Sequence, residues 1–423
     1  MPSHPRRLSP PRRASSSSAA QHPQSMAYPF PRFSSAPQTP QYLKSVESPN
    51  SWQSRGFDKP RSYPTRWLLL LLAAAVVFIF LLARSFAAHP WQTDRIPFSK
   101  SDMDDFFNHF EGRQDCGIAS TDIYLPPISF HATTEKHSLY CPNRAKLLQA
   151  MSGGGRHGFD TPYFPLGCHF RWYSTSEICM ILDRFDSVIF LGDNPLRHIY
   201  SAFNMLLREN IALGGLRQWD MKENEREACR CDNQLTRPEC LAYSVLDSRS
   251  VRSNDAVSGH SSPYFCDRTP HVFIPIDRSP APEDLHTAFN SILHREPDSY
   301  KPIAVVHSLS VATSLAWPTA TSSMDEWVTL ADISQKNVPF LWVGPNAAGH
   351  LKPPSQILSQ GNNALWHYTI EMAKEAEARQ LDALGMYNFT LQAGSWDGTY
   401  YGQEVVLVQA MMIINWLSRL EST

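Results

Sequence analysis

The chain of 423 residues predicts an α/β domain whose mostly parallel sheet is flanked by helices, preceded by one transmembrane helix and a disordered N-terminal tail. Three observations predict this arrangement. A long apolar run without charge follows a segment rich in proline and serine, and beyond residue 180 short buried-strand patterns alternate with helical ones. Alternation of strands and helices favours a parallel sheet, because each crossover helix returns the chain to the same edge.

The tail is predicted from its composition. Residues 1–66 carry ten Lys or Arg and two Asp or Glu, a net charge of +8. The whole chain has a net charge of −2, so residues 67–423 carry −10. The tail also holds twelve of the 33 prolines and fourteen serines, without any apolar period, which predicts disorder. The nearly balanced total charge argues against a nucleic-acid-binding protein that relies on basicity.

The apolar run predicts a membrane anchor. Residues 67–83 read WLLLLLAAAVVFIFLLA, without charge, Gly or Pro. Because about 20 apolar residues span the hydrocarbon, we predict a transmembrane signal anchor over 67–86. The excess of Lys and Arg before it places the tail in the cytosol, as in a type II single-pass protein, with 87–115 as a stem. A buried core helix and a cleaved signal peptide are the alternatives, and the long polar segment before the run disfavours the second.

The cysteines indicate an oxidising compartment. All eight follow the anchor, so up to four disulfides are expected in the lumen of the endoplasmic reticulum or Golgi, with the pairing left open. The Cys229-Arg230-Cys231 pair also has the form of a metal-binding motif, although disulfides are favoured in this compartment. Asn388-Phe389-Thr390 is a candidate N-glycosylation site on the same side. The cysteines are Cys116, Cys141, Cys168, Cys179, Cys229, Cys231, Cys240 and Cys266.

The elements of the lumenal domain follow from apolar periodicity. A buried strand is expected over 187–191, then a turn at 192–195 and a helix over 196–207. Further strands are expected at 303–306 and 340–343. Helices are expected at 363–384, with Gly385 as its C-cap, and at 404–417. Residues 210–300 hold half of the cysteines and are expected to form loops or an inserted subdomain.

Ligands of open α/β sheets bind at the carboxyl ends of the strands. Segments 192–194 and 344–350 follow predicted strands, and 396–402 precedes the last helix. The N-terminus of the helix over 196–207, together with the Asn194 amide, also suits an anion or a carbonyl. Four tryptophans near these ends are expected either to stack on sugar rings or to pack in the core: Trp317, Trp342, Trp366 and Trp396. The candidate pocket residues are Gly192, Arg197, Gly344, His350 and Trp396.

The strand-Gly192-Asp193-Asn194-helix pattern and the Asp397-x-x-Tyr400 pattern before the last helix resemble the SGNH hydrolase superfamily. Within it they resemble the polysaccharide O-acetyltransferase and esterase branch, which includes plant trichome-birefringence-like proteins and fungal capsule-associated O-acetyltransferase relatives. The resemblance covers residues 115–420 and implies an SGNH-like domain over 116–423, linked to O-acetylation of polysaccharides or glycoconjugates. The proline- and serine-rich tail suggests a fungal member.

The resemblance also implies roles for single positions. In the family the first motif is G-D-S, with a serine nucleophile, and the last is D-x-x-H, with a histidine base. A middle asparagine, matched by Asn346, helps to form the oxyanion hole. In this chain Asn194 stands at the serine position and Tyr400 at the histidine position, whereas Asp193 and Asp397 remain.

These departures predict a catalytically silent relative. The lone pair of an amide nitrogen is delocalised, so Asn194 is a poor nucleophile, and a tyrosine with a pKa near 10 is a poor base at neutral pH. We therefore expect a domain without cofactor or metal that binds a polysaccharide or glycoprotein, or that assists an active acetyltransferase.

Two other functions remain open at this point. The first is an active acetyltransferase or esterase with a displaced nucleophile, Ser308 or Ser310, and a base at His307 or His350. The second is a type II glycosyltransferase, which often holds a metal–nucleotide with a D-x-D motif. The candidate for that motif is Asp102-Met103-Asp104, in the stem and ahead of any predicted strand.

Overall fold

The computed structural model describes residues 105–125, 139–258 and 269–421. The predicted tail, the predicted anchor at 67–86, the Asp102-Met103-Asp104 motif and Cys266 lie outside these ranges. Among the helices of the described ranges, none has the length and hydropathy that crossing a membrane requires.

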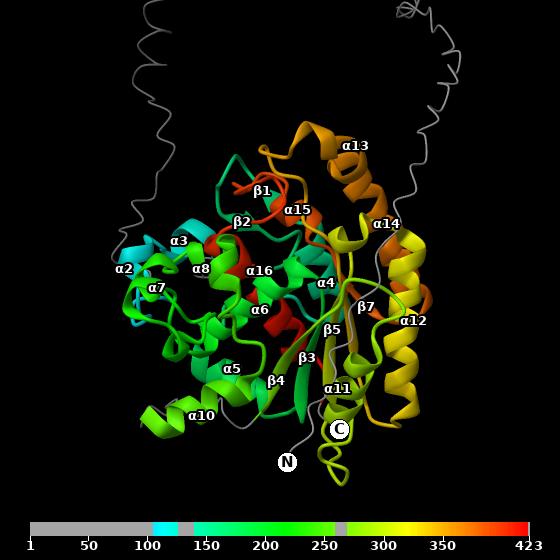
Figure 1. Ribbon diagram of the computed structural model, residues 1–423. Coiled ribbons are helices and arrows are strands. Elements are labelled where there is room, and N and C mark those ends of the chain that lie inside the picture. Colours follow the sequence, from blue (N-terminus) through cyan, green and yellow to red (C-terminus); the bar gives the residue numbers. More distant parts are fainter. Residues whose placement is uncertain (1–104, 126–138, 259–268, 422–423) are drawn as a thin grey trace, which may run out of the picture. The chain divides into compact units, whose positions relative to one another are not determined.

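A five-stranded parallel sheet forms the centre of the described domain (Figure 1). Its strands lie in the order β4-β3-β5-β6-β7, and every neighbouring pair is parallel. This confirms the α/β prediction and the three strands expected from the sequence. The bounds are β3 Ser187–Gly192, β4 His271–Pro275, β5 Ile303–Ser308, β6 Phe340–Val343 and β7 Asp382–Leu384.

Both faces of the sheet are covered, which explains the continuous apolar runs of β3 and β5. Successive strand residues point to opposite faces, so Val188 and Phe190 join one core cluster and Ile189 and Leu191 another. The first cluster is shared with α6 (Asn194–Leu207) and α16 (Gln403–Ser418). The second is shared with α11 (Glu283–Leu293) and α12 (Trp317–Ile333). Figure 1 shows α12 and α14 (Asn362–Ala378) on one side of the sheet and α6 and α16 on the other.

Shorter elements complete the domain. A two-stranded antiparallel ribbon pairs β1 (Gly155–Arg156) with β2 (Tyr163–Phe164). The other helices are α2 Arg113–Cys116, α3 Ser120–Ile123, α4 Arg144–Gly153, α5 Thr175–Leu182, α7 Glu223–Ala228, α8 Asn233–Thr236, α9 Pro238–Leu241, α10 Ser248–Ser258, α13 Ile357–Gln360 and α15 Tyr387–Thr390.

Three boundaries differ from the sequence prediction. The helix expected over 363–384 ends at Ala378, because Gln380 adopts a positive φ of 59° and the following residues form β7, so Gly385 follows a strand and is no helix cap. The expected irregular region 210–300 contains a sheet strand, β4, and a regular helix, α11. Residues 105–115, assigned to the stem, belong to the domain, since Phe107 is fully buried in its core.

The disulfide prediction is confirmed for the described cysteines. Bonds join Cys116 to Cys231, Cys141 to Cys168 and Cys229 to Cys240, and Cys179 is disulfide-bonded as well. The Cys229-Arg230-Cys231 pair therefore forms two separate disulfides, which overturns the alternative of a metal-binding motif. These bonds indicate an oxidising secretory or extracellular compartment.

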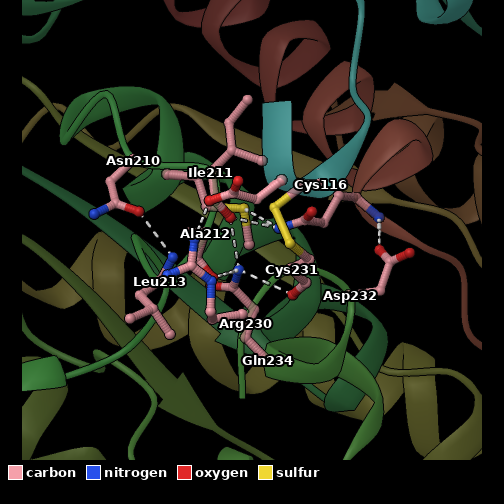
Figure 2. The surroundings of a disulfide bond; sticks show 12 residues. Cys116, Asn210, Ile211, Ala212, Leu213, Arg230, Cys231, Asp232 and Gln234 are labelled. Carbon is pink, nitrogen blue, oxygen red and sulfur yellow. Dashed lines mark hydrogen bonds and ion pairs between the residues drawn. A yellow bond between two sulfur atoms is a disulfide. The ribbon is translucent and has the colours of Figure 1, made fainter. Parts of the chain in front are cut away.

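One disulfide fastens the irregular part of residues 210–247 to the domain (Figure 2). Beside Cys116–Cys231, the Gln234 side-chain amide donates hydrogen bonds to the carbonyls of Ile211 and Ala212, at 2.8 and 3.0 Å. The neighbouring Asp232 Oδ1 accepts from the backbone N–H of Gln403, the first residue of α16, at 2.7 Å. The disulfide-held segment thus caps the helix that follows the 396–402 loop.

Candidate functional site

The site lies where the strand order of the sheet reverses. From β3 the chain passes to β4 on one side of it and then crosses to β5 on the other side. In open α/β sheets this switch point leaves a crevice outside the carboxyl ends of the two central strands, where ligands bind. Here those ends are Gly192 and Ser308, which are register partners.

A pocket of about 320 Å³ opens at this point. It brings together two of the three segments predicted from the sequence, 192–194 and 396–402, with the loop after β5 and the segment around α13. The lining residues are Asp193, Asn194, Val311, Ala312, Pro353, Gln356, Gln360, Asp397, Thr399 and Tyr400.

Gly192 is required by the close approach of β5. A Cβ atom at this position would lie 2.5 Å from the Ser308 carbonyl oxygen and 2.6 Å from Leu196 Cδ2. No side chain fits at these distances, so glycine is needed for β3 to turn directly into α6 beside β5.

Asp193 ties the first segment to the loop after β5. It is 5% exposed, and its Oδ2 accepts hydrogen bonds from Ser310 N, Ser310 Oγ and Ala312 N at 2.9, 3.1 and 3.3 Å. Its Oδ1 is buried without a partner among the described residues. Burial raises the pKa of this carboxyl group, against the lowering effect of those hydrogen bonds. Asp193 therefore organises the backbone around the pocket.

Asn194 and Tyr400 meet at the pocket. Asn194 is the exposed first residue of α6, and its side chain and that of Tyr400 both line the pocket. The Tyr400 ring also lies against the buried His198 ring, with centroids 4.8 Å apart. Burial raises the pKa of Tyr400, so its hydroxyl is protonated at neutral pH and does not serve as a base.

Asp397 shapes the loop that carries Tyr400. Its Oδ1 accepts from the backbone N–H groups of Thr399 and Tyr400 at 2.8 and 2.9 Å, an Asx-type turn. Gly398 adopts a φ of +82°, and a Cβ there would lie 2.1 Å from Lys352 N. The carboxylate thus faces its own loop as a structural acceptor.

Lys352 is a site residue that the sequence analysis did not single out. It is 8% exposed, and its Nζ donates to Gln360 Oε1 and Thr399 Oγ1 at 3.0 and 2.8 Å. These bonds fasten the wall around α13 to the Asp397 loop, and burial lowers the pKa of the amine. The sequence does mark this residue, because Lys352 is the only Lys, Arg, Asp or Glu among residues 344–366.

The other candidate pocket residues do not line this pocket. The Arg197 guanidinium donates to the Leu241 carbonyl, and His350 is exposed with its ring 5.4 Å from that of Phe159. Asn346 Oδ1 accepts from Gln409 Nε2 at 2.6 Å. Gly344 is buried at the end of β6, whereas Trp396, 50% exposed, adjoins the lining residue Asp397.

Ser308, Ser310 and His307 of the displaced-nucleophile alternative are buried, whereas His350 is exposed. Ser308 and Ser310 are 3% and 1% exposed, and the Ser310 hydroxyl donates to Asp193. His307, 1% exposed, pairs through Nε2 with Ser323 Oγ of α12 at 3.0 Å, and burial lowers its pKa to about 4. Within the described ranges, no hydrogen bond joins a histidine side chain to Ser308 or Ser310.

The candidate glycosylation site is built into α15. Asn388 is half-buried, and its Nδ2 donates to the Ser152 carbonyl at 2.9 Å. Thr390 is fully buried, and its hydroxyl donates to the Met386 carbonyl and accepts from Ala347 N. Modification of Asn388 remains a prediction.

Comparison with known proteins does not identify a family for this chain. No protein-family model matches the chain, and a search of curated proteins finds no match. Among the described residues, no group of His, Cys, Asp and Glu is arranged to hold a metal ion. The functional conclusion therefore rests on the pocket and its residues.

Proposed function

We propose that the domain is a catalytically silent SGNH-like domain that binds a polysaccharide or glycoconjugate, or assists an active O-acetyltransferase. In this proposal the chain is a type II single-pass membrane protein of the endoplasmic reticulum or Golgi, with the domain in the lumen. The observation that carries the proposal is that Asn194 and Tyr400 line the same pocket at the carboxyl edge of the sheet.

Their shared pocket supports the resemblance because the two residues are far apart in sequence. The family's nucleophile and base must lie beside each other in one site, and the residues at the matching positions of this chain line one pocket. Gly192 and Asp193 support it further, since the turn from β3 into α6 leaves no room for a Cβ at Gly192 and Asp193 fastens that turn to the loop after β5. The frame of such a site is therefore compatible with this fold.

The side chains within that frame do not support acyl transfer. Asn194 offers an amide in place of a nucleophile, and Tyr400 offers a protonated hydroxyl in place of a base. Removal of triad members leaves roughly 10³- to 10⁴-fold catalysis over water in hydrolases that keep their oxyanion hole. Neither Ser308 nor Ser310 gives the displaced-nucleophile alternative support, because both are buried and neither lines the pocket.

Hydrolysis of an activated acetyl ester by the full-length protein in detergent tests the proposal. The wild type is expected to match the buffer rate, and the Asn194→Ser, Tyr400→His double variant is expected to exceed it clearly. Asn194→Ala with Tyr400→Phe is the matched control and should stay at the buffer rate. A wild type as fast as the double variant would contradict the silent site, and an inactive double variant would contradict the SGNH-like frame.

A further inference from the structure

The exposed tryptophans of the described domain lie in, or directly after, chain segments that also contribute residues to the pocket lining. Trp396, Trp317 and Trp366 are 50%, 44% and 40% exposed, whereas Trp342 is buried at 1%. Trp342 therefore packs in the core, which is one of the two alternatives expected for these tryptophans. The other three expose aromatic surface to solvent, and each ring offers an apolar face on which a ligand can stack.

These tryptophans belong to three segments that we call the uncharged rim: residues 309–318, 351–366 and 394–400. Lys352 and Asp397 are the charged residues within them, and Lys352 Nζ is bonded to Gln360 and Thr399. The rim follows β5 and β6 and precedes α16, whereas the loop after the edge strand β4 carries the exposed Asp277 and Arg278.

The rim is continuous with the pocket. Each of its segments contributes lining residues: Val311 and Ala312 from the first, three residues from the second, and Asp397, Thr399 and Tyr400 from the third. Trp396 is the direct neighbour of Asp397, Trp317 comes five residues after Ala312, and Trp366 six after Gln360. At 3.6 Å per residue or less, the Cα atoms of Trp317 and Trp366 lie within about 18 and 22 Å of those residues. These limits place both tryptophans within reach of a chain of several sugar rings that occupies the pocket.

The chemistry of the rim selects a neutral ligand. Flat indole rings suit the apolar faces of sugar rings, and the hydroxyl and amide groups of Thr399, Tyr400 and Gln356 suit their hydroxyls. A carboxylated, sulfated or phosphorylated glycan would need a Lys or Arg to pair with. Lys352 is already committed to neutral oxygens, and the exposed Asp397 repels anions.

We propose that the uncharged rim binds an uncharged, extended polysaccharide over several sugar units and discriminates against anionic ones. This inference rests on the glycan-binding part of the proposed function and names the class of glycan. A second copy of the chain is the competing occupant, because Leu351, Ile357 and Leu358 are also exposed, Leu358 to 94%. The polar pocket among the rim residues favours the glycan.

Binding of matched oligosaccharides to the full-length protein in detergent tests this inference. The probes are β-1,4-linked mannohexaose and glucohexaose and their C6-oxidised forms, which keep the backbone and add carboxylates. At least one uncharged hexasaccharide should bind, with its oxidised form at least tenfold weaker. Trp396→Ala should weaken that binding about tenfold. Tyr300→Ala is the control, because Tyr300 is 90% exposed and precedes the opposite, amino end of β5.

Several outcomes would overturn the inference: equal or tighter binding of the oxidised forms, no binding of either uncharged probe, or full affinity in Trp396→Ala. Loss of self-association in Trp396→Ala, measured by sedimentation, would assign the rim to a second copy. Ester hydrolysis is a separate readout. A silent wild type that binds no hexasaccharide contradicts this inference alone, and a wild type that binds and hydrolyses contradicts only the silent site.

Discussion

The side chains of Asn194 and Tyr400 line the same pocket at the carboxyl edge of the sheet, although the two residues are far apart in the sequence. Asn194 begins α6 directly after the first strand of the sheet, and Tyr400 lies just before the last helix. Their placement depends on Gly192, on Asp193 and on the loop held by Asp397 and Lys352. Substitution of these supporting residues should therefore have measurable effects.

Gly192→Ala should destabilise the protein. Its Cβ would collide with the Ser308 carbonyl and with Leu196, so either β5 or α6 must shift, at a cost of about 1–3 kcal/mol. The melting temperature checks this result. Gly155→Ala is the control, since a Cβ there meets nothing within 4 Å. Equal melting temperatures for the two variants would show that β5 does not approach Gly192 this closely.

Asp193→Ala and Asp193→Asn should differ. Alanine leaves the N–H groups of Ser310 and Ala312 and the Ser310 hydroxyl without their shared acceptor, which we expect to cost about 1–3 kcal/mol. Asparagine keeps an acceptor oxygen, and its NH₂ replaces an oxygen that has no hydrogen-bond partner. Chemical denaturation should therefore find Asp193→Asn clearly more stable than Asp193→Ala. The reverse order would mean that the ionised carboxylate is essential.

The Cys116–Cys231 disulfide should contribute more stability than Cys141–Cys168. It spans 115 residues against 27, and closing a longer loop removes more entropy from the unfolded chain, about 4.7 kcal/mol for a 100-residue loop. It also holds the segment in which Asp232 caps α16. Paired Cys→Ala variants of each bond, compared by thermal melting, check this order. A smaller loss for the Cys116–Cys231 pair would contradict it.

Stability should fall as the pH drops below about 6.5. Burial lowers the pKa of His198 and of His307 to about 4 and that of His271 to about 3. A histidine of the unfolded chain has a pKa near 6.5 and therefore binds a proton before the buried histidine does. Protonation then stabilises the unfolded state relative to the folded state as the pH falls from about 6.5 towards about 4. These histidines thus contribute stability that is complete above pH 6.5.

Melting temperatures at pH 7.5 and pH 5 measure this effect. His307→Asn should show a smaller pH dependence than the wild type, whatever its absolute stability. His350→Asn, at an exposed position, should keep the wild-type dependence. A pH dependence unchanged in His307→Asn would mean that His307 is not held neutral in the folded state.

The sequence predicted the parts of the fold whose signal is local. The buried runs at 187–191, 303–306 and 340–343 gave three strands, because strands covered on both faces are apolar throughout. The edge strands were missed: β4 is bounded by His271 and Pro275, and β7 has three residues and continues the periodic pattern of α14. α14 ends because Gln380 adopts a positive φ, a conformation that a glutamine in the sequence does not predict.

The candidate site was predicted only where its residues have a local sequence signal. Asp193, Asn194, Asp397 and Tyr400 follow strand ends or precede a helix, and all four line the pocket. Arg197 was expected there from its place in the first turn of α6, but its side chain reaches the Leu241 carbonyl of the disulfide-rich segment. Lys352 and Gln360 were missed because their roles depend on tertiary contacts with Thr399 and with each other.

The most direct test of the central claim is labelling of the full-length protein with a fluorophosphonate, followed by mass spectrometry. This reagent reacts with serine nucleophiles that are activated by a base. The account predicts no adduct on the wild type and an adduct on Ser at position 194 in the Asn194→Ser, Tyr400→His double variant. An adduct on Ser308 or Ser310 of the wild type would contradict it and would identify an active enzyme with a displaced nucleophile.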